Sequence, residues 1–282
     1  MRVLGIDVPQ ELLLRWTSWF APQSQPFLIP KGHRLESLGE PFDPQRNPEV
    51  RDTFQIYGED ERIVHRSVDS ETFLTLSRDD RATLIRLQVE QGRSVVPAIR
   101  SWPALSSSHV IAAGDGDRFL WWPQLLKGRE EEVLIAFVEE GRLPSRHREV
   151  SKKVWNNAQL ALPGARAIAG SFPLASGPNC FGTIMAAAGV EGAALEWMLR
   201  EPFEEWLAEN SDKGGSDDEV GVILIWRSDS GLVEHAAVTL GDGWALHKPS
   251  QGWMSPVKVL SVPEAIRSAR QKGRRLTRRR LE

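Results

Sequence analysis

The spacing of apolar residues changes along the chain, and the change predicts where a β-sheet begins. After residue 219 apolar residues form short runs or alternate with polar ones. Residues 220–226 and residues 232–240 therefore predict two strands joined by a turn. Gly241-Asp242-Gly243 predicts a tight turn into a third strand at residues 244–247. The last part of the chain is expected to form an antiparallel sheet.

The first 165 residues show mostly helical spacing. Residues 22–48 contain six prolines, so we expect that stretch to be irregular and extended. Apolar residues at helical intervals, with capping residues at the ends, predict four helices before residue 165. They cover residues 9–20, 77–92, 130–140 and 146–162.

Length and composition allow two domains in an α+β protein. The chain has 282 residues, of which 41% are apolar, which is enough to bury a sizeable core. Residues 1–164 predict a mixed, mainly helical region of unknown role. Residues 165–265 predict a domain in which a helix packs on the antiparallel sheet, and residues 266–282 predict a basic C-terminal tail.

Cys180, the only cysteine, stands where a nucleophile is commonly placed. Asn179 is expected to be the N-cap of a helix that begins at Cys180. Unpaired N–H groups at that helix end favour a thiolate. The N–H of Cys180 is the expected oxyanion donor, with the Asn179 side chain as an alternative. The competing interpretation is that Cys180 is a small buried apolar residue.

Two histidines of the predicted hairpin offer partners for the thiol. His235 lies in the second strand and His247 lies 12 residues later in the third. Cross-strand side chains lie about 5 Å apart, so this spacing can bring both rings together. We expect Cys180 as nucleophile, His235 as its base within hydrogen-bonding reach, and His247 to orient His235. This arrangement predicts a thiol pKa below about 8.5, whereas the alternative for each histidine is a structural imidazole.

These residues resemble the NlpC/P60 branch of the papain-like cysteine hydrolases over residues 165–262. The shared pattern is Asn179-Cys180 at a helix start, a strand histidine 55 residues later in Glu234-His235-Ala236, and a polar residue after 12 more, His247. The family usually has Asp-Cys-Ser-Gly around its cysteine, where this chain has Asn179 and Phe181. The resemblance implies a papain-like fold and a Cys-His-His triad. Its members are mostly cell-wall peptidases, with some amidases, acyltransferases and secreted toxins.

The sequence therefore predicts a thiol-dependent hydrolase, either a peptidase or an amidase, acting on a peptide or amide substrate. Neither a cofactor nor a metal ion is expected, because the other histidines lack paired ligand spacing. Three alternatives stay open. The same site can serve an acyltransferase or deamidase, it can serve a toxin-like effector, or the chain can be a non-catalytic interaction protein that retains the papain-like shell.

The net charge of −3 conceals an acidic body and a basic end. Residues 1–265 hold 27 basic and 37 acidic residues. Residues 266–282 can attract a weak anionic partner, but the simpler expectation is a frayed end that folds back on the acidic body. The start of the chain lacks a signal-peptide pattern, and no run reaches the ~20 apolar residues of a membrane span, so a cytoplasmic location is expected. The cations of the basic end are Arg267, Arg270, Lys272, Arg274, Arg275, Arg278, Arg279 and Arg280.

Overall fold

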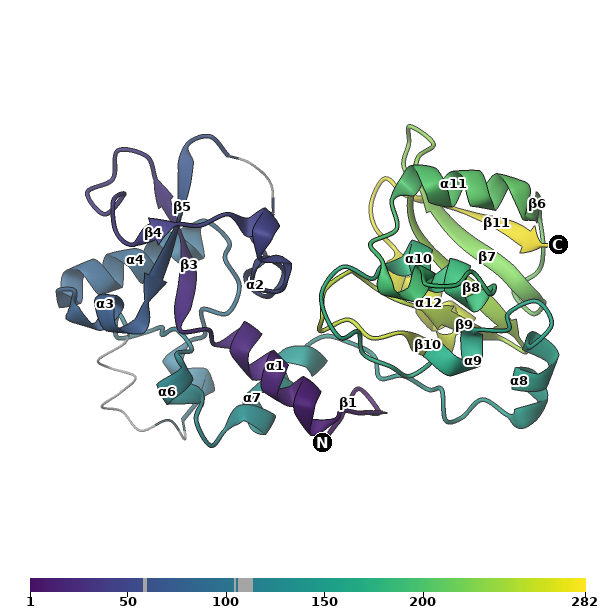
Figure 1. Cartoon of the computed structure of the whole chain (residues 1–282), viewed down its shortest axis with the longest axis horizontal. Coiled ribbons are helices and arrows are strands. Elements are labelled where there is room, and N and C mark those ends of the chain that lie inside the picture. Colours follow the sequence, from purple (N-terminus) through teal and green to yellow (C-terminus); the bar gives the residue numbers. More distant parts are fainter. Residues whose placement is uncertain (58–59, 104, 106–113) are drawn as a thin grey trace. The chain divides into compact units, whose positions relative to one another are not determined.

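The computed structural model describes residues 1–57, 60–103, 105 and 114–282 (Figure 1). The chain forms two compact units, and the mixture of helices and antiparallel sheets confirms the α+β class. One unit is Pro9–Phe137, and the other combines Met1–Val8 with Val138–Glu282. The predicted boundary at residues 164 and 165 is therefore wrong. The segment just before residue 165 belongs to the second unit together with the N-terminus. The N–H of Ser145 donates to the carbonyl of Leu4, and the N–H of Arg146 donates to the carbonyl of Val259.

The unit Pro9–Phe137 is built around a small antiparallel sheet whose strand order is β3-β5-β4. Its strands are β3 (Ser24–Pro30), β4 (Glu40–Pro41) and β5 (Ile63–Asp69). Phe27, Phe73, Leu84 and Trp122 belong to its buried core. Its helices are α1 (Gln10–Phe20), α2 (Pro48–Phe54), α3 (Ser70–Thr75), α4 (Arg78–Glu90) and α6 (Pro123–Leu126). The unit ends within α7 (Glu130–Glu139). Short 3-10 turns lie at Pro44–Arg46 and Ile99–Ser101.

Three of the four predicted helices are confirmed as α1, α4 and α7. Ser77 caps α4 by accepting the N–H of Asp80, as the capping pattern predicts. The expected irregular stretch was partly wrong, because β3 is a strand although it contains Pro26 and Pro30. It lies at the edge of its sheet, where a missing N–H removes few ladder hydrogen bonds.

The second unit contains a six-stranded antiparallel sheet with the strand order β10-β9-β8-β7-β11-β6. The three predicted strands are confirmed as β7 (Val220–Arg227), β8 (Val233–Gly241) and β9 (Trp244–His247). The other strands of the sheet are β6 (Ser211–Lys213), β10 (Lys258–Ser261) and β11 (Arg275–Leu281), and β1 (Arg2–Val3) pairs with β2 (Ile6–Asp7).

Helices cover both faces of this sheet. The fourth predicted helix is shorter than expected, since only α8 (Lys152–Ala158) forms within residues 146–162. Among the helices that the structure describes, none is long and apolar enough to cross a membrane. The others in this unit are α9 (Ala165–Ile168), α10 (Cys180–Ala187), α11 (Arg200–Glu209) and α12 (Val262–Ala269), with a 3-10 turn at Ala193–Leu195.

The alternation of side chains along β7 and β8 divides the interior into two cores. Ile225 of β7 and Ala236 of β8 are register partners and belong to the core beneath α10. Leu224 and Ala237, one position along each strand, belong to the core beneath α12. Since successive strand residues point to opposite faces, the sheet has an apolar layer on each side.

Residues 266–282 are part of the fold, so the predicted basic tail is wrong. They complete α12 and form β11, which pairs with β7 on one side and β6 on the other. The acidic residues of the same unit neutralise several of the arginines, which makes the basic strand compatible with the sheet. The ion pairs are Arg274–Glu234, Arg275–Asp229, Arg278–Asp217 and Arg280–Glu219.

Deleting residues 275–282 should expose the edge of β7, because the N–H and C=O groups that β11 pairs would lose their partners. We expect amide hydrogen exchange across Val220–Arg227 to accelerate by orders of magnitude in the shortened protein. Deleting Glu282 alone, which lies beyond β11, is the control and should leave β7 protected. Full protection of β7 in the longer deletion would mean that the segment is a dispensable tail.

Candidate functional site

Cys180 opens α10, and Asn179 is confirmed as its N-cap. Asn179 Oδ1 accepts the N–H of Gly182 at 3.1 Å, and Asn179 Nδ2 donates to the carbonyl of Met198 at 2.7 Å. Both polar atoms of the Asn179 side chain therefore hold the start of the helix. The backbone N–H of Cys180 remains the expected oxyanion donor.

The thiol of Cys180 is buried, with 8% of the residue exposed. Burial raises its pKa to about 11, although the backbone N–H groups of Ala236 and Phe181 and the charge of Lys248 act in the opposite direction. The expected lowering of this pKa is therefore wrong. Loss of hydration outweighs the N–H groups and the cation, so the thiol is protonated at neutral pH.

His235 and His247 lie side by side, as the hairpin spacing predicts. Their Nε2 atoms are 2.8 Å apart, and their ring planes are nearly perpendicular at 88°. The register pairs Thr239 with Ala245, which makes the two histidines diagonal neighbours on β8 and β9. Trp226 of β7 is the direct partner of His235, and their ring centroids are 5.3 Å apart.

Burial keeps both imidazoles neutral. It lowers the pKa of His235 to about 4, with a further lowering from the charge of Arg274. It also holds the pKa of His247 well below its usual value, assisted by unfavourable interaction with a proton on His235 and by the charges of Lys258 and Lys248. His247 Nδ1 is buried without a hydrogen-bond partner. A neutral His235 can accept a proton, which a general base must do.

The structure does not join the thiol directly to this histidine pair. Cys180 makes no hydrogen bond to either ring, although its sulfur is close to the N–H of Ala236, the residue after His235. Ala236 shares the core beneath α10 with Cys180, whereas the ring of His235 packs on Trp226, which belongs to the core beneath α12. The thiol and the imidazole thus approach β8 from opposite faces. The expected hydrogen bond between Cys180 and His235 is not formed.

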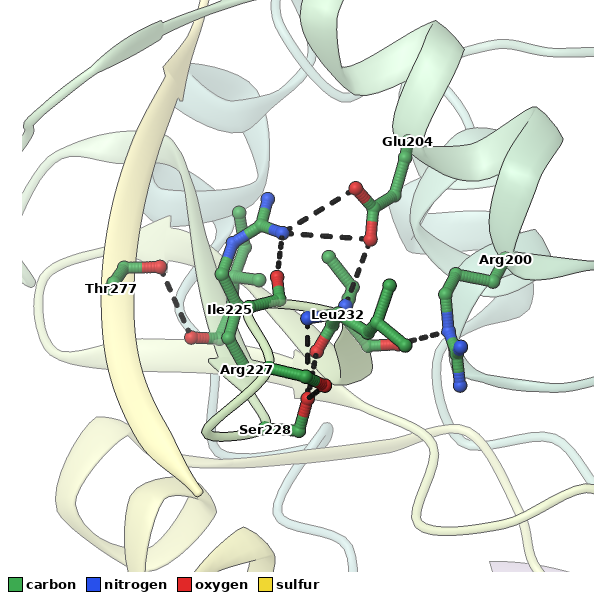
Figure 2. A network of polar contacts seen from close by, with 10 residues as sticks. Arg200, Glu204, Ile225, Arg227, Ser228, Leu232 and Thr277 are labelled. Atoms are coloured by element: carbon green, nitrogen blue, oxygen red, sulfur yellow. Dashed lines mark hydrogen bonds and ion pairs between the residues drawn. The ribbon is translucent and has the colours of Figure 1, made fainter. Parts of the chain in front are cut away.

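Two side chains of α11 clamp the start of β8 just before His235 (Figure 2). Arg200 Nε donates to the carbonyl of Val233, and the N–H of Val233 donates to Glu204 Oε1, both at 2.8 Å. Arg227 of β7 donates to Glu204 and to the carbonyl of Gly231. The clamp fixes the backbone at the bulge that precedes His235. The only sequence signal for it was the opposite charges of Arg200 and Glu204 four residues apart on a helix.

A cavity of about 350 Å³ lies beside the start of α10 and the start of β8. Sequence reasoning did not find it, because its walls come from segments far apart in the chain. Asn179, Phe181, Trp197, Met198, Leu199, Arg200, Val233, Glu234 and Arg274 line it.

No protein family, curated protein or solved structure matches the chain. Within the ranges that the structure describes, no group of three or more His, Cys, Asp or Glu side chains is arranged to hold a metal ion.

The buried histidines predict a loss of stability as the pH falls. In the unfolded chain His235 titrates near 6.5, so between pH 6.5 and 4 the unfolded state binds a proton that the folded state excludes. The contribution of neutral His235 to the free energy of unfolding is fully present above about pH 6.5. At about pH 5, protonation of His235 in the unfolded chain should lower the free energy of unfolding by about 2 kcal/mol. Urea unfolding of wild type and His235→Gln at both pH values measures this difference. His33→Gln, in the other unit, is the control, and an equal loss in wild type and His235→Gln would contradict the assignment.

Proposed function

We propose that the unit formed by Met1–Val8 and Val138–Glu282 is a thiol-dependent hydrolase, a peptidase or amidase of the papain-like NlpC/P60 type. The observation that supports it best is the 2.8 Å contact of His247 with His235, which lies on the strand that Cys180 touches. A histidine held through Nε2 by a polar third residue leaves Nδ1 to act on a nucleophile, which is the logic of a catalytic triad.

The reaction forms and then hydrolyses a thioester on Cys180. His235 Nδ1 takes the thiol proton while the sulfur attacks the substrate carbonyl, and the N–H of Cys180 stabilises the oxyanion. His235 returns the proton to the leaving amine. It then takes a proton from water, which attacks the thioester and releases the acid and the free thiol. The proposed mechanism requires that His235 Nε2 is the donor in its 2.8 Å contact with His247 Nε2, because only that tautomer leaves Nδ1 basic.

The resting site holds a neutral thiol and a neutral imidazole, because the pKa of Cys180 is about 11 and that of His235 is about 4. Proton transfer therefore accompanies attack on the carbonyl. Because the sulfur and the His235 ring approach β8 from opposite faces, this proton transfer requires the β8 backbone around His235 to rearrange when substrate binds. Catalytic hydrogen bonds are often loose or misaligned without substrate and tighten in the Michaelis complex.

Acylation of Cys180 tests this proposal without knowledge of the natural substrate. With 4-nitrophenyl acetate as acyl donor, we expect a burst of nitrophenol and an acetyl group on Cys180, both lost in Cys180→Ala. His235→Ala should slow acylation by about 10²- to 10³-fold, and His247→Ala should slow it less, because it acts through His235. His65→Ala, in the other unit, is the matched histidine control. Acylation at the same rate in all three histidine variants would contradict the proposed triad.

The second candidate is a non-catalytic interaction protein that retains this shell. The buried thiol, with its raised pKa and no hydrogen bond to an imidazole, favours it. The two functions differ in how iodoacetamide alkylates Cys180 with pH. For the hydrolase, His235→Ala slows alkylation near neutral pH because the base is lost. For the interaction protein, one inflection near pH 11 is expected in wild type and in both histidine variants.

A further inference from the structure

The cavity beside α10 contains two arginines whose terminal nitrogens are available to a ligand. Arg200 Nε donates a hydrogen bond to the carbonyl of Val233 at 2.8 Å. In Figure 2 no dashed line joins the terminal nitrogens of Arg200 to the other residues drawn. Arg274 Nε donates to Glu234 Oε2 at 2.6 Å. The terminal nitrogens of both guanidinium groups donate no hydrogen bond to any residue that the structure describes. Each group is thus anchored at one side and free to donate from the other.

The charge of the cavity lining favours an anion. Arg200 and Arg274 contribute two cations, and Glu234 is the one acid among the lining residues. A neutral ligand would leave one guanidinium without a counter-ion in a partly enclosed space. A carboxylate matches the planar fork of a guanidinium and accepts two parallel hydrogen bonds from it.

The rest of the lining favours an apolar group next to that anion. Phe181 forms one part of the wall, and Trp197 and Leu199 form another. Trp197 is 49% exposed and Leu199 is 60% exposed, so both have surface left to cover. A ligand that joins a carboxylate to an apolar side chain would meet both parts of the lining.

We propose that this cavity binds a peptide acyl donor through a side-chain carboxylate, which Arg200 and Arg274 recognise, with an adjacent apolar residue against Trp197 and Leu199. The inference rests on the proposed function, since it assigns the cavity to the substrate. Asn179 and Phe181, on either side of Cys180, line the cavity. Cys180 itself does not line the cavity, so a peptide held there must extend past Asn179 and Phe181 to reach the sulfur, with its carboxylate setting which carbonyl is presented.

Binding to the full-length Cys180→Ala protein tests this inference without turnover. The probes are N-acetyl-Leu-Glu-amide and its isostere N-acetyl-Leu-Gln-amide, compared by calorimetry. We expect the acidic peptide to bind about tenfold more tightly, the ratio expected for a charge-assisted hydrogen-bonded pair. In Arg274→Gln the ratio should fall toward one. Arg275→Gln is the matched control, because its side chain is 81% exposed and outside the cavity, and it should keep the ratio.

Equal binding of the two peptides, or a preference that survives in Arg274→Gln, would overturn the inference. So would inorganic phosphate that displaces the acidic peptide at lower concentration than acetate does, because the cavity would then select phosphate. Arg200→Lys is a second variant that keeps the charge but loses the fork, and it should reduce the ratio while circular dichroism shows the fold retained. Loss of acylation with the peptide preference intact would remove the hydrolase proposal and leave the carboxylate site.

Discussion

The antiparallel register of β8 between β7 and β9 is the constraint on which the rest of the second unit depends. It places Ala236 opposite Ile225 and His235 opposite Trp226, so one strand supplies a wall of the α10 core and the buried histidine. A shift of one residue would exchange the two faces and bury Glu234 in place of an apolar side chain. The clamp of Arg200 and Glu204 on Val233 holds the strand at the end where such a shift would begin.

Burial, rather than attraction between charges, decides the electrostatics around Cys180. The thiol lies at a helix N-terminus near the charge of Lys248, yet its pKa rises because hydration is lost. The same loss of hydration lowers the pKa of both neighbouring histidines. A site built from neutral partners avoids a buried ion pair, whose desolvation penalty can exceed its attraction. The proposed hydrolase chemistry would then depend on proton transfer during the reaction, not on a preformed thiolate.

Charge is concentrated instead on β11, which lies between β7 and the edge strand β6. β11 has a row of arginines, and acidic residues from neighbouring loops pair with them. Arg274, just before β11, joins Glu234 at the bulge of β8 and faces the cavity with Arg200. The basic segment at the end of the chain therefore completes the sheet and supplies a cation beside the candidate site.

Local patterns in the sequence determined much of this protein. The alternation over residues 220–247 predicted β7, β8 and β9, and the interval of 12 residues predicted that His235 and His247 would meet. Asn179 as the N-cap of a helix beginning at Cys180 was also predictable, because a cap depends on neighbours within three residues.

Only the tertiary structure decided which face of the sheet each side chain occupies and how deeply it is buried. The pKa of Cys180 and its separation from the His235 ring depend on contacts with β8 that no local pattern encodes. The strand β11 could not be predicted for the same reason. Its seven residues resemble a charged tail in the sequence, because the acids that neutralise them come near only in the folded chain. Capping and strand alternation are local in sequence, whereas desolvation and charge pairing depend on residues far apart in the chain.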